Sequence, residues 1–536
     1  MRVADFFCGA GGFSEGFRQK GFDVVFALDN WEPAVKTHDL NHPDCKCVQM
    51  DILNLDTPAK IDAVVPDVDI IIGSPPCVAF SGSNKAGKAD KSLGIKLIEA
   101  YLRIVAWKSK GTLKYWILEN VPNSGNYIKE KYSWRELGLP GKGPDLEVRQ
   151  RNILNAALYG APQKRKRFVC GDYPVPIETN PTTRDWVTMA KVMNALTNPL
   201  CNKKPAKITD PLYGFSIPSS QLTDHFYDSH VEEYEWSRAK RLKEDHGFMG
   251  KMDFPERLDR AARTVMATMS ASTRESMIFA AKKDGKDAGF RLPTIREIAT
   301  FMSFPINYQF EGGNEGTKYK LVGNAVCCKL SAALAAAIAK RERIPLSECV
   351  AFPSRKPSVN LNGMKRIAKS PKPKRPDARF SVHIPYLKIK GFRVELTNKG
   401  FEFGNSKFKW TAILHHGSGK DAKKATLTER DVESMLSKEP GFKRFKKLVE
   451  TEFKNVRVTS AQLQESYVLN DASKNLTPDG ALMLMKSLVD KAYPESKFGE
   501  TFIENTRASK GISRSQIPLR VLAGMYACTI FVHRLS

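Results

Sequence analysis

Short apolar runs alternate with amphipathic stretches over the first 175 residues of the chain. The runs that we expect to form β-strands are Arg2–Phe7, Val24–Leu28, Asp69–Ile72, Tyr115–Leu118 and Arg167–Cys170. Between them, Leu93–Trp107 and Glu147–Leu158 repeat apolar residues at helical spacing. Strands that alternate with helices predict an α/β fold with a mainly parallel sheet.

The pattern changes twice further along the chain. From about residue 176 to 262, Pro, aromatic and charged residues are mixed, and we expect a small irregular insert. Regular patterning returns in RLPTIREIATFMSFP and closes with GNAVCCKLSAALAAAIAK, a loop that runs into a helix. The segment from Pro353 to Pro376 is rich in Pro, Lys and Ser, as linkers are. A further mixed module of domain size follows, in which KEPGFKRFKKLVETEFKNVR predicts an amphipathic helix.

Positive charge is concentrated near the end of the chain. The 536 residues carry a formal net charge of +26. Residues 351–536 hold 35 Lys and Arg against 17 Asp and Glu, whereas residues 1–350 hold 49 against 41. Such an excess is typical of contact with a polyanion, and nucleic acid is the leading candidate. A basic surface without a specific partner is the alternative.

The cysteines and the apolar segments predict a cellular location. Ten cysteines show no CxxC pair and no regular framework, which is typical of a reduced intracellular protein. The start MRVADFFCG does not resemble a secretory signal, and Leu330–Ala339 is too short to span a bilayer. We therefore predict a cytoplasmic protein without membrane contact. Cys45, Cys47, Cys327 and Cys328 are expected to pack in the core, and no metal site is predicted.

A glycine-rich turn, FCGAGGFSEGF, follows the first strand and opens a helix. Its backbone can turn tightly and admit a ligand at Gly9, Gly11 and Gly12. The dinucleotide-binding pattern fails, because its last glycine would fall at Ser14. Asp29 ends the second strand, where it can bind ribose hydroxyls, and Asp51 ends what we expect to be the third. Together these features favour a nucleoside-like cofactor that lacks a pyrophosphate.

The stretch GSPPC places Cys77 directly after a buried strand, where α/β sheets bind ligands. Pro75 and Pro76 stiffen the loop that carries the thiol. An inert buried cysteine is the alternative interpretation. In ILENVPN, Glu119 follows the next strand in the same way.

The string YGAPQKRKRFVCG places Gln163, Arg165 and Arg167 on one face if the segment is extended. A nucleophile, a carboxyl group and guanidinium groups therefore come from three successive strand regions. An active site is the simplest explanation.

Six motifs stand in the order found in C5-cytosine DNA methyltransferases, namely DFFCGAGG, GSPPC with FS three residues on, ENV, YG-PQ-R-R, R-PT-RE with FP, and GNAV. The chain resembles this family over about residues 1–345, the insert excluded. The resemblance implies a Rossmann-like methyltransferase domain, S-adenosylmethionine as cofactor, double-stranded DNA as partner and an inserted target-recognition domain. The expected divisions are catalytic residues 1–175, recognition insert 176–275, catalytic completion 276–345, basic linker 346–380 and an accessory α+β domain 381–536.

The resemblance also implies roles for individual residues. Cys77 would attack C6 of a cytosine rotated out of the duplex, and Glu119 would bind N3 and the exocyclic amine. Arg167, with Arg165, would hold O2 of the base and a nearby phosphate. One position departs from the family, since Val78 stands where a glutamine is usual.

For the cofactor, the resemblance implies that Phe7 packs on the adenine, that Asp29 takes the ribose hydroxyls and that Asp51 takes the adenine amine. The pocket would be completed by Gly9, Gly11, Ile52, Pro76 and Asn324.

The sequence thus leads to one main hypothesis and two alternatives. The main one is a monomeric, sequence-specific DNA cytosine-C5 methyltransferase of the prokaryotic modification type, associated with the nucleoid, whose cognate restriction endonuclease acts separately. A tRNA cytosine-5 methyltransferase is the first alternative, although it would not need a large basic tail. The second is a non-catalytic DNA-binding relative, which would not need the nucleophile.

Overall fold

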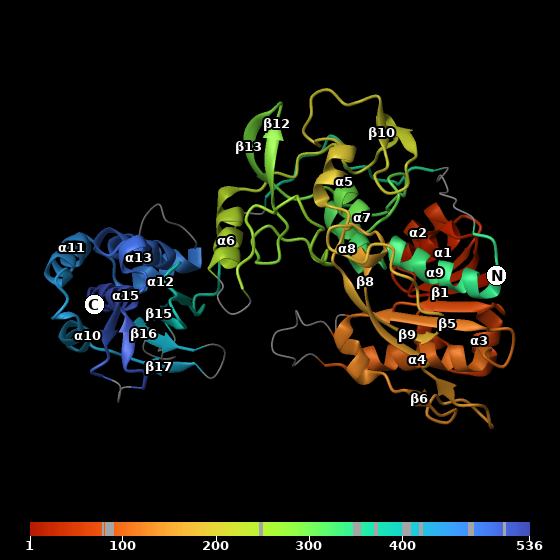
Figure 1. Ribbon diagram of the computed structural model, residues 1–536, viewed down its shortest axis with the longest axis horizontal. Helices are drawn as coiled ribbons and strands as arrows, with labels where there is room; N and C mark the ends of the chain where they lie inside the picture. The colour runs from red at the N-terminus through yellow and green to blue at the C-terminus, as the bar shows by residue number, and fades with distance from the viewer. Residues whose placement is uncertain are drawn as a thin grey trace. The chain divides into compact units, whose positions relative to one another are not determined.

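The chain forms two compact units (Figure 1). The computed structural model describes residues 1–77, 80, 90–245, 250–346, 355–368, 373–398, 409–417, 422–469, 476–507 and 511–535. The first unit consists of Met1–Trp236 and Pro255–Arg366, and the second of Ser237–Phe254 and Ile367–Ser536.

A seven-stranded sheet forms the centre of the first unit. Its strands, in order across the sheet, are β3 (Lys46–Gln49), β2 (Asp23–Asp29), β1 (Arg2–Phe6), β4 (Ile70–Gly73), β5 (Tyr115–Asn120), β9 (Lys166–Asp172) and β8 (Gln150–Asn155). The first five are parallel to their neighbours, and β9 runs antiparallel to β5 and β8. This sheet confirms the predicted α/β fold, and it brings the carboxyl ends of five strands to one edge.

Helices cover both faces of this sheet (Figure 1). One face carries α1 (Gly12–Gln19), α2 (Glu32–Asn41) and α9 (Cys328–Glu342), and the other carries α3 (Pro58–Val64) and α4 (Ser92–Lys108). Strand β4 shows why both faces are apolar. Ile70 and Ile72 pack in the core on the side of α1, α2 and α9, and Ile71 packs in the core on the side of α3 and α4. The residues alternate because successive side chains of a strand point to opposite faces.

The prediction of a helix over Glu147–Leu158 is wrong. The segment contains part of β7 (Leu146–Glu147, paired with β6, Lys131–Tyr132), then β8 and a 3₁₀ turn at Ala156–Tyr159. Strand β8 pairs with β9 from Gln150↔Gly171 to Asn155↔Lys166. The backbone groups of β8 bond to β9, and this pairing cannot be predicted from the local spacing of apolar residues.

The region expected to be irregular contains short elements joined by long connections. They are α5 (Met189–Leu196), the hairpin of β10 (Lys207–Thr209) with β11 (Ser216–Pro218), and α6 (Glu233–Glu244). Beyond this region, β12 (Phe279–Lys283) forms a hairpin with β13 (Lys286–Arg291). Helices α7 (Ile295–Phe301) and α8 (Glu315–Asn324) follow. Three further 3₁₀ turns lie at Ile52–Asn54, Pro122–Tyr127 and Ser219–Gln221.

Part of the predicted basic linker packs within the first unit. Asn360 Oδ1 accepts a hydrogen bond from Asp224 N at 3.0 Å, and Asn362 Oδ1 accepts one from His225 N at 2.9 Å. Arg366 forms an ion pair with Glu235 at 2.7 Å. The functional division of the chain into domains stays a prediction.

One run of the described chain, Glu315–Glu342, is by length and composition able to cross a membrane, since it contains an 18-residue window with a mean hydropathy of 1.8. It comprises α8 and α9, and 72% of the window is buried inside the protein. Helix α9 packs closely on α1, where Ser331 Oγ donates to Phe13 O at 2.5 Å and leaves no room for a Cβ at Gly16. The extent of burial shows that α9 is a helix of the protein core.

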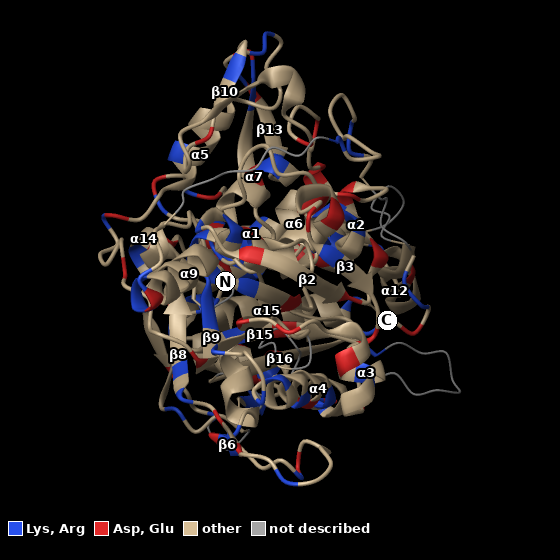
Figure 2. Cartoon of the chain, turned by 90° about the vertical axis from the view of Figure 1, so that its right-hand side faces the viewer, with Lys and Arg blue, Asp and Glu red and all other residues tan. Residues whose placement is uncertain are grey.

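The second unit is an α+β domain with its own core. Its antiparallel sheet consists of β14 (Ser381–His383), β15 (Phe392–Thr397), β16 (Thr411–His416) and β17 (Lys423–Ala425). The other elements are α10 (Glu429–Leu436), α11 (Phe442–Lys454), α12 (Ser460–Leu469), α13 (Pro478–Ala492), α14 (Glu495–Phe498), the hairpin β18 (Phe502–Glu504) with β19 (Gln516–Pro518), and α15 (Leu519–His533). Figure 2 shows Lys and Arg on many elements, with Asp and Glu among them.

Candidate active site

The predicted nucleophile and carboxyl group lie at the ends of adjacent strands. Cys77 is half-buried on the loop that leaves β4, and Glu119, 4% exposed, lies near the end of β5. Ser74 Oγ donates a hydrogen bond to Glu119 Oε2 at 2.6 Å, and Arg167 Nε lies 2.8 Å from Oε1. Since both oxygens are held, the carboxylate has a fixed orientation.

The loop that carries Cys77 is tied to the strands on either side. Ser74 N donates to Phe6 O at 3.1 Å, at the end of β1. Asn120 Nδ2, at the end of β5, donates to Pro75 O at 3.0 Å. These bonds and the two prolines make the loop stiff up to the thiol. Val78 lies outside the described residues.

The structure differs from the expectation for Arg165. Its side chain is 3% exposed, and its guanidinium donates to Val265 O at 2.9 Å, Gly323 O at 2.9 Å and Ala325 O at 3.2 Å. Gln163 is buried beside it and accepts from Val265 N at 3.0 Å. These two side chains therefore attach the segment before β9 to the segments around Val265 and Gly323. The geometry does not support a contact of Arg165 with the base.

Electrostatics nevertheless link Arg165 to the reactive groups. The pKa of Arg165 is lowered to about 10, first by burial and then by Arg167, against the raising influence of Cys327, Glu119 and Cys77. Strand β5 pairs with β4 on one side and with β9 on the other, and Arg167 at the start of β9 pairs with Glu119. The three strand regions singled out in the sequence thus meet.

We expect Arg165→Met to lower the free energy of unfolding by about 2–4 kcal/mol, because three buried carbonyl groups lose a charged donor. Urea unfolding of the full chain, followed by tryptophan fluorescence, measures the change. Arg165→Lys should lie in between, since an ammonium keeps the charge but not the planar fork. A full loss of turnover with an unchanged urea midpoint would contradict this structural role.

The glycine turn follows β1, the strand next to β4 at the same edge, and it is organised by Asp29 at the end of β2. Its Oδ2 accepts from Gly9 N and its Oδ1 from Trp31 N, both at 2.9 Å. Burial raises the pKa of Asp29, while these backbone N–H groups oppose the change. Phe7 is half-buried with φ of 56°, a left-handed conformation that is costly for a bulky residue.

The remaining predicted cofactor residues are spread around this turn. Asp51 is exposed, and its Oδ1 accepts from Leu53 N at 2.9 Å. Ile52 is buried, Pro76 is exposed in the Cys77 loop, and Asn324 is exposed at the end of α8.

Helix α8 also reaches the end of β2, where Lys320 Nζ lies 4.3 Å from the centre of the Trp31 ring. Trp31 was not among the predicted residues, although an aromatic residue two positions after Asp29 is a signal visible in the sequence.

A network of buried polar side chains contacts the glycine turn and the first turn of α1. Ser14 Oγ donates to Asp5 Oδ2 at 2.7 Å and lies 3.0 Å from His38 Nε2. Tyr308 OH donates to Ala10 O at 2.6 Å. Burial raises the pKa of Asp5 to about 7 and lowers that of His38 to about 3. This network was not predicted, because its residues are isolated polar positions in otherwise apolar segments and their partners lie far along the chain.

The cysteines outside the active site are mostly buried. Cys327 lies 3.8 Å from the sulfur of Met302, and burial raises its pKa to about 11. Cys47 Sγ lies 3.9 Å from Cys8 Sγ, and burial raises the pKa of Cys8 and of Cys45. Protonated thiols pack as small apolar side chains. In the described part of the chain, one group of metal-ligand type was found, His38, Asp39 and Cys47, with ligand atoms within 4.8 Å of one another.

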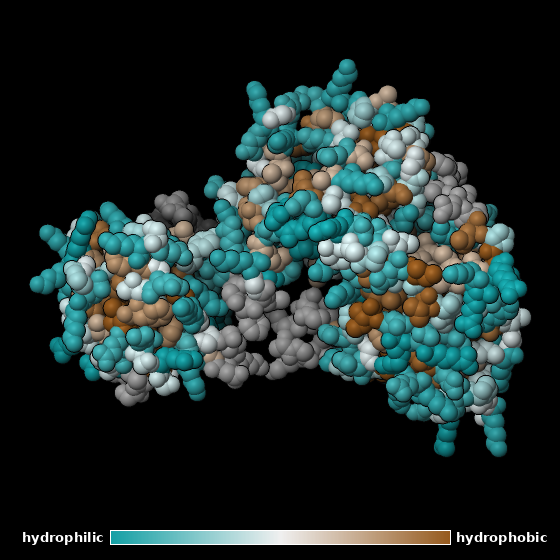
Figure 3. All heavy atoms as spheres, viewed as in Figure 1, coloured by the Kyte–Doolittle hydropathy of each residue, from teal (hydrophilic) through white to brown (hydrophobic). Residues whose placement is uncertain are grey.

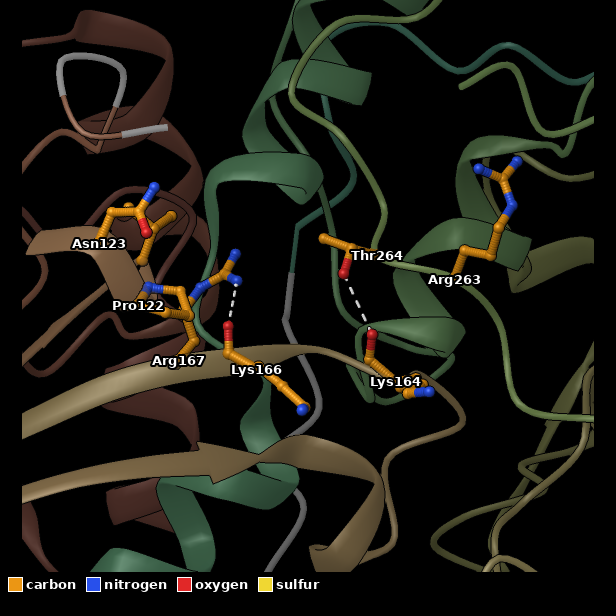
Figure 4. A pocket seen from close by; sticks show the side chains of 8 residues that line it. Pro122, Asn123, Lys164, Lys166, Arg167, Arg263 and Thr264 are labelled. Carbon is orange, nitrogen blue, oxygen red and sulfur yellow. Dashed lines mark hydrogen bonds between the residues drawn. The ribbon is translucent and has the colours of Figure 1, made fainter. Parts of the chain in front are cut away.

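A pocket of about 530 Å³ opens beside Arg167 (Figure 4). It is lined by Val121, Pro122, Asn123, Lys164, Lys166, Arg167, Arg263 and Thr264. Lys164 and Lys166 are exposed, whereas Arg263 is paired with Glu256 at 2.8 Å. The pocket is therefore basic and adjoins the Glu119–Arg167 pair. Lys164 and Lys166 alternate with Gln163, Arg165 and Arg167, a signal in the sequence that the prediction did not include.

Comparison with known proteins connects this site to one family. The model of the C-5 cytosine-specific DNA methylases matches residues 1–340. The type II methyltransferase M.HgiDI of Herpetosiphon aurantiacus is 30% identical, covering 63% of this chain and 94% of its own length. M.MthTI of Methanothermobacter thermautotrophicus is 29% identical, covering 63% and 97%. Among solved structures, the Dnmt2 methyltransferase of S. pombe is 16% identical with a TM-score of 0.41, covering 64% of this chain and 99% of its own.

Proposed function

Because the chain belongs to the C-5 cytosine-specific DNA methylase family, we propose that it transfers a methyl group from S-adenosylmethionine to a cytosine within a specific duplex sequence. It is a DNA cytosine methyltransferase. The observation that supports the proposed mechanism is that Cys77 and Glu119 come from the ends of the adjacent strands β4 and β5, with the Glu119 carboxylate held by Ser74 and Arg167.

The residues at the glycine turn fit the cofactor that this reaction requires. Gly9 has φ of 52°, and the nearest heavy atom to a Cβ there would lie 4.0 Å away, so the turn leaves open space. S-adenosylmethionine would supply an electrophilic methyl group on a sulfonium. Asp29 would bind the ribose hydroxyls, Asp51 the adenine amine, and Phe7 would pack on the ring.

Three further residues are proposed to line this cofactor site. Ile52 would form its apolar floor, Pro76 the side towards Cys77 and Asn324 the side towards α8. They belong to the segments that adjoin Asp51, Cys77 and Lys320.

The reacting residues have separate tasks. The Cys77 thiolate forms a bond to C6 of cytosine, and the ring electrons move to C5, which becomes nucleophilic enough to take the methyl group. Glu119 binds N3 and the exocyclic amine and donates a proton as charge builds on the ring. Arg167 holds Glu119 and O2 of the base. Loss of the C5 proton then expels the thiolate and restores the aromatic ring.

The basic pocket beside Arg167 suits the target nucleotide. A cytosine inside a duplex hides C5 and C6, so the base must leave the stack at a cost of a few kcal/mol. The pocket volume of about 530 Å³ accommodates a nucleotide, and its walls offer Asn123, Lys164 and Lys166. The lysines would hold phosphate oxygens on either side of the extruded base.

The remaining proposals concern sequence recognition, a partner enzyme and the oligomeric state, and the first two follow from the similarity to type II methyltransferases. Residues 176–275 would read the DNA sequence, and a separate restriction endonuclease would cut the same sequence when it is unmethylated. A monomer is expected to suffice, because the proposed reacting and cofactor residues all lie in the first unit.

Incubation of the full chain with radiolabelled S-adenosylmethionine and either duplex DNA or tRNA tests this function. We expect label in DNA at C5 of cytosine within one short sequence, which bisulfite sequencing of DNA from an expressing host would identify. The tRNA arm separates the proposal from its alternative. Label in tRNA alone would overturn the DNA assignment, and label in neither would favour a binding protein.

A further inference from the structure

Helix α11 of the second unit has one buried face and one basic face. Its buried residues recur at helical spacing and are Phe442, Phe445, Val449 and Phe453. The exposed positions include Lys443, Lys447 and Lys454, which lie on one line along the helix. From Lys443 to Lys454 this line is roughly three turns or about 16 Å long. We call these three residues the α11 basic row.

The charges of the row are not neutralised by ion pairs in the described part of the chain. One acid, Glu450, lies on the same line between Lys447 and Lys454. It is 3.9 Å from Lys446, which also pairs with Glu433, so the row keeps a net positive charge. Arg444, one position beyond Lys443, is also exposed. The outer edge of the unit at α11 is covered by hydrophilic side chains (Figure 3).

The row continues into a groove at the end of α11. The groove has a volume of about 680 Å³, and its charged lining residues are the cations Lys454, Arg457 and Arg534 and the acids Glu429 and Glu450. The Glu429 carboxylate contacts His533, whose Nδ1 lies 3.2 Å from Glu429 Oε2. Arg457 and Arg534 are exposed and extend the positive surface beyond the helix.

We propose that the α11 basic row and this groove form a surface that binds the phosphate backbone of duplex DNA, independently of the methylation site. A row about 16 Å long can face several phosphates of a duplex, which carries one negative charge per roughly 1.7 Å of its axis. Lysines on a helix surface contact phosphates without reading bases. The surface would therefore bind DNA irrespective of sequence.

Duplex DNA fits this surface better than an acidic protein does. Protein interfaces usually contain an apolar core, often with aromatic anchors. The large apolar side chains exposed in the described part of the second unit, Ile367, Tyr386, Leu469 and Met483, all lie outside α11 and the groove. The same polypeptide carries a DNA methylase, so DNA held by either unit is at high local concentration for the other.

The test compares two triple variants of the full chain with equal loss of charge. The first, K443Q/K447Q/K454Q, removes the row, and the second, K423Q/K424Q/K497Q, removes exposed lysines elsewhere in the same unit. All six side chains are exposed, so both variants are expected to keep the circular dichroism spectrum of the parent. Binding to a fluorescent poly(dA)·poly(dT) duplex is measured over a series of salt concentrations. This duplex has no cytosine, so the result does not depend on the proposed reaction.

We expect the row variant to bind about 10- to 100-fold more weakly at low salt, with a slope of log K against log salt that falls by roughly 2–3. The control variant should change the slope by less than one. Equal losses in both variants would show a diffuse charge effect and overturn the proposal. Loss of binding to polyglutamate with unchanged duplex binding would do the same and identify an acidic-protein surface.

Discussion

Replacing Cys77 by serine is expected to lower turnover by a factor on the order of 10⁴ or more, because a hydroxyl is a far weaker nucleophile towards C6 than a thiolate. The loop geometry should survive, since Ser74 N to Phe6 O and Asn120 Nδ2 to Pro75 O do not involve the sulfur. Binding of S-adenosylmethionine at the glycine turn should therefore be unchanged. A rate measurement under single-turnover conditions separates the chemical step from binding.

A covalent trap gives a second readout for Cys77. Fluorine at C5 cannot leave as a proton does, so duplex DNA with 5-fluorocytosine at the target position should accumulate as a complex that resists denaturation. Cys77→Ser should form none. Cys201→Ser, at a half-buried cysteine of the insert, is the matched control and should trap as the parent does. A complex that persists in Cys77→Ser would show that another residue is the nucleophile.

Glu119→Gln is expected to lower turnover by on the order of 10²- to 10⁴-fold, because the amide keeps the shape of the side chain but cannot act as an acid. One amide oxygen can still accept from Arg167, and the folded structure should persist. The cofactor affinity should not change, since Glu119 is bonded to Ser74 and Arg167, whereas Asp29 is bonded to Gly9. Single-turnover rates and calorimetric titration of S-adenosylmethionine measure the two effects.

The control for this variant is Glu99→Gln, at an exposed position of α4. It removes the same charge from the same unit and should leave turnover unchanged. If both variants lose activity to a similar extent, the effect of Glu119 is one of net charge. If Glu119→Gln is fully active, the carboxyl group has no part in proton transfer.

Much of the site could be predicted because its residues follow parallel strands. Apolar runs predict β1, β2, β4 and β5 within one or two residues. Asp29 and Glu119 directly follow two of these runs, and Cys77 lies in the loop after a third. Carboxyl ends of parallel strands meet at one edge of a sheet, so Asp29, Cys77 and Glu119 had to share that edge. The same reasoning found the amphipathic period of α11.

The errors arise where a partner comes from far along the chain. The apolar residues of β8 have helical spacing, but pairing with β9 makes the segment a strand. Alternation put Gln163 and Arg165 on one face, yet nothing local shows that this face meets Val265 and Gly323. Ser74 was passed over because its role depends on Glu119, 45 residues away.

The sequence by itself therefore determined the parallel α/β domain, the order of its motifs and the residue types that carry the chemistry, since side-chain periodicity and strand ends are local properties. Only the tertiary structure decided which groups hold Glu119, what the Arg165 guanidinium contacts and that Lys454, Arg457 and Arg534 share a groove. Hydrogen bonds and ion pairs form within about 4 Å in space, and separation along the chain does not predict them.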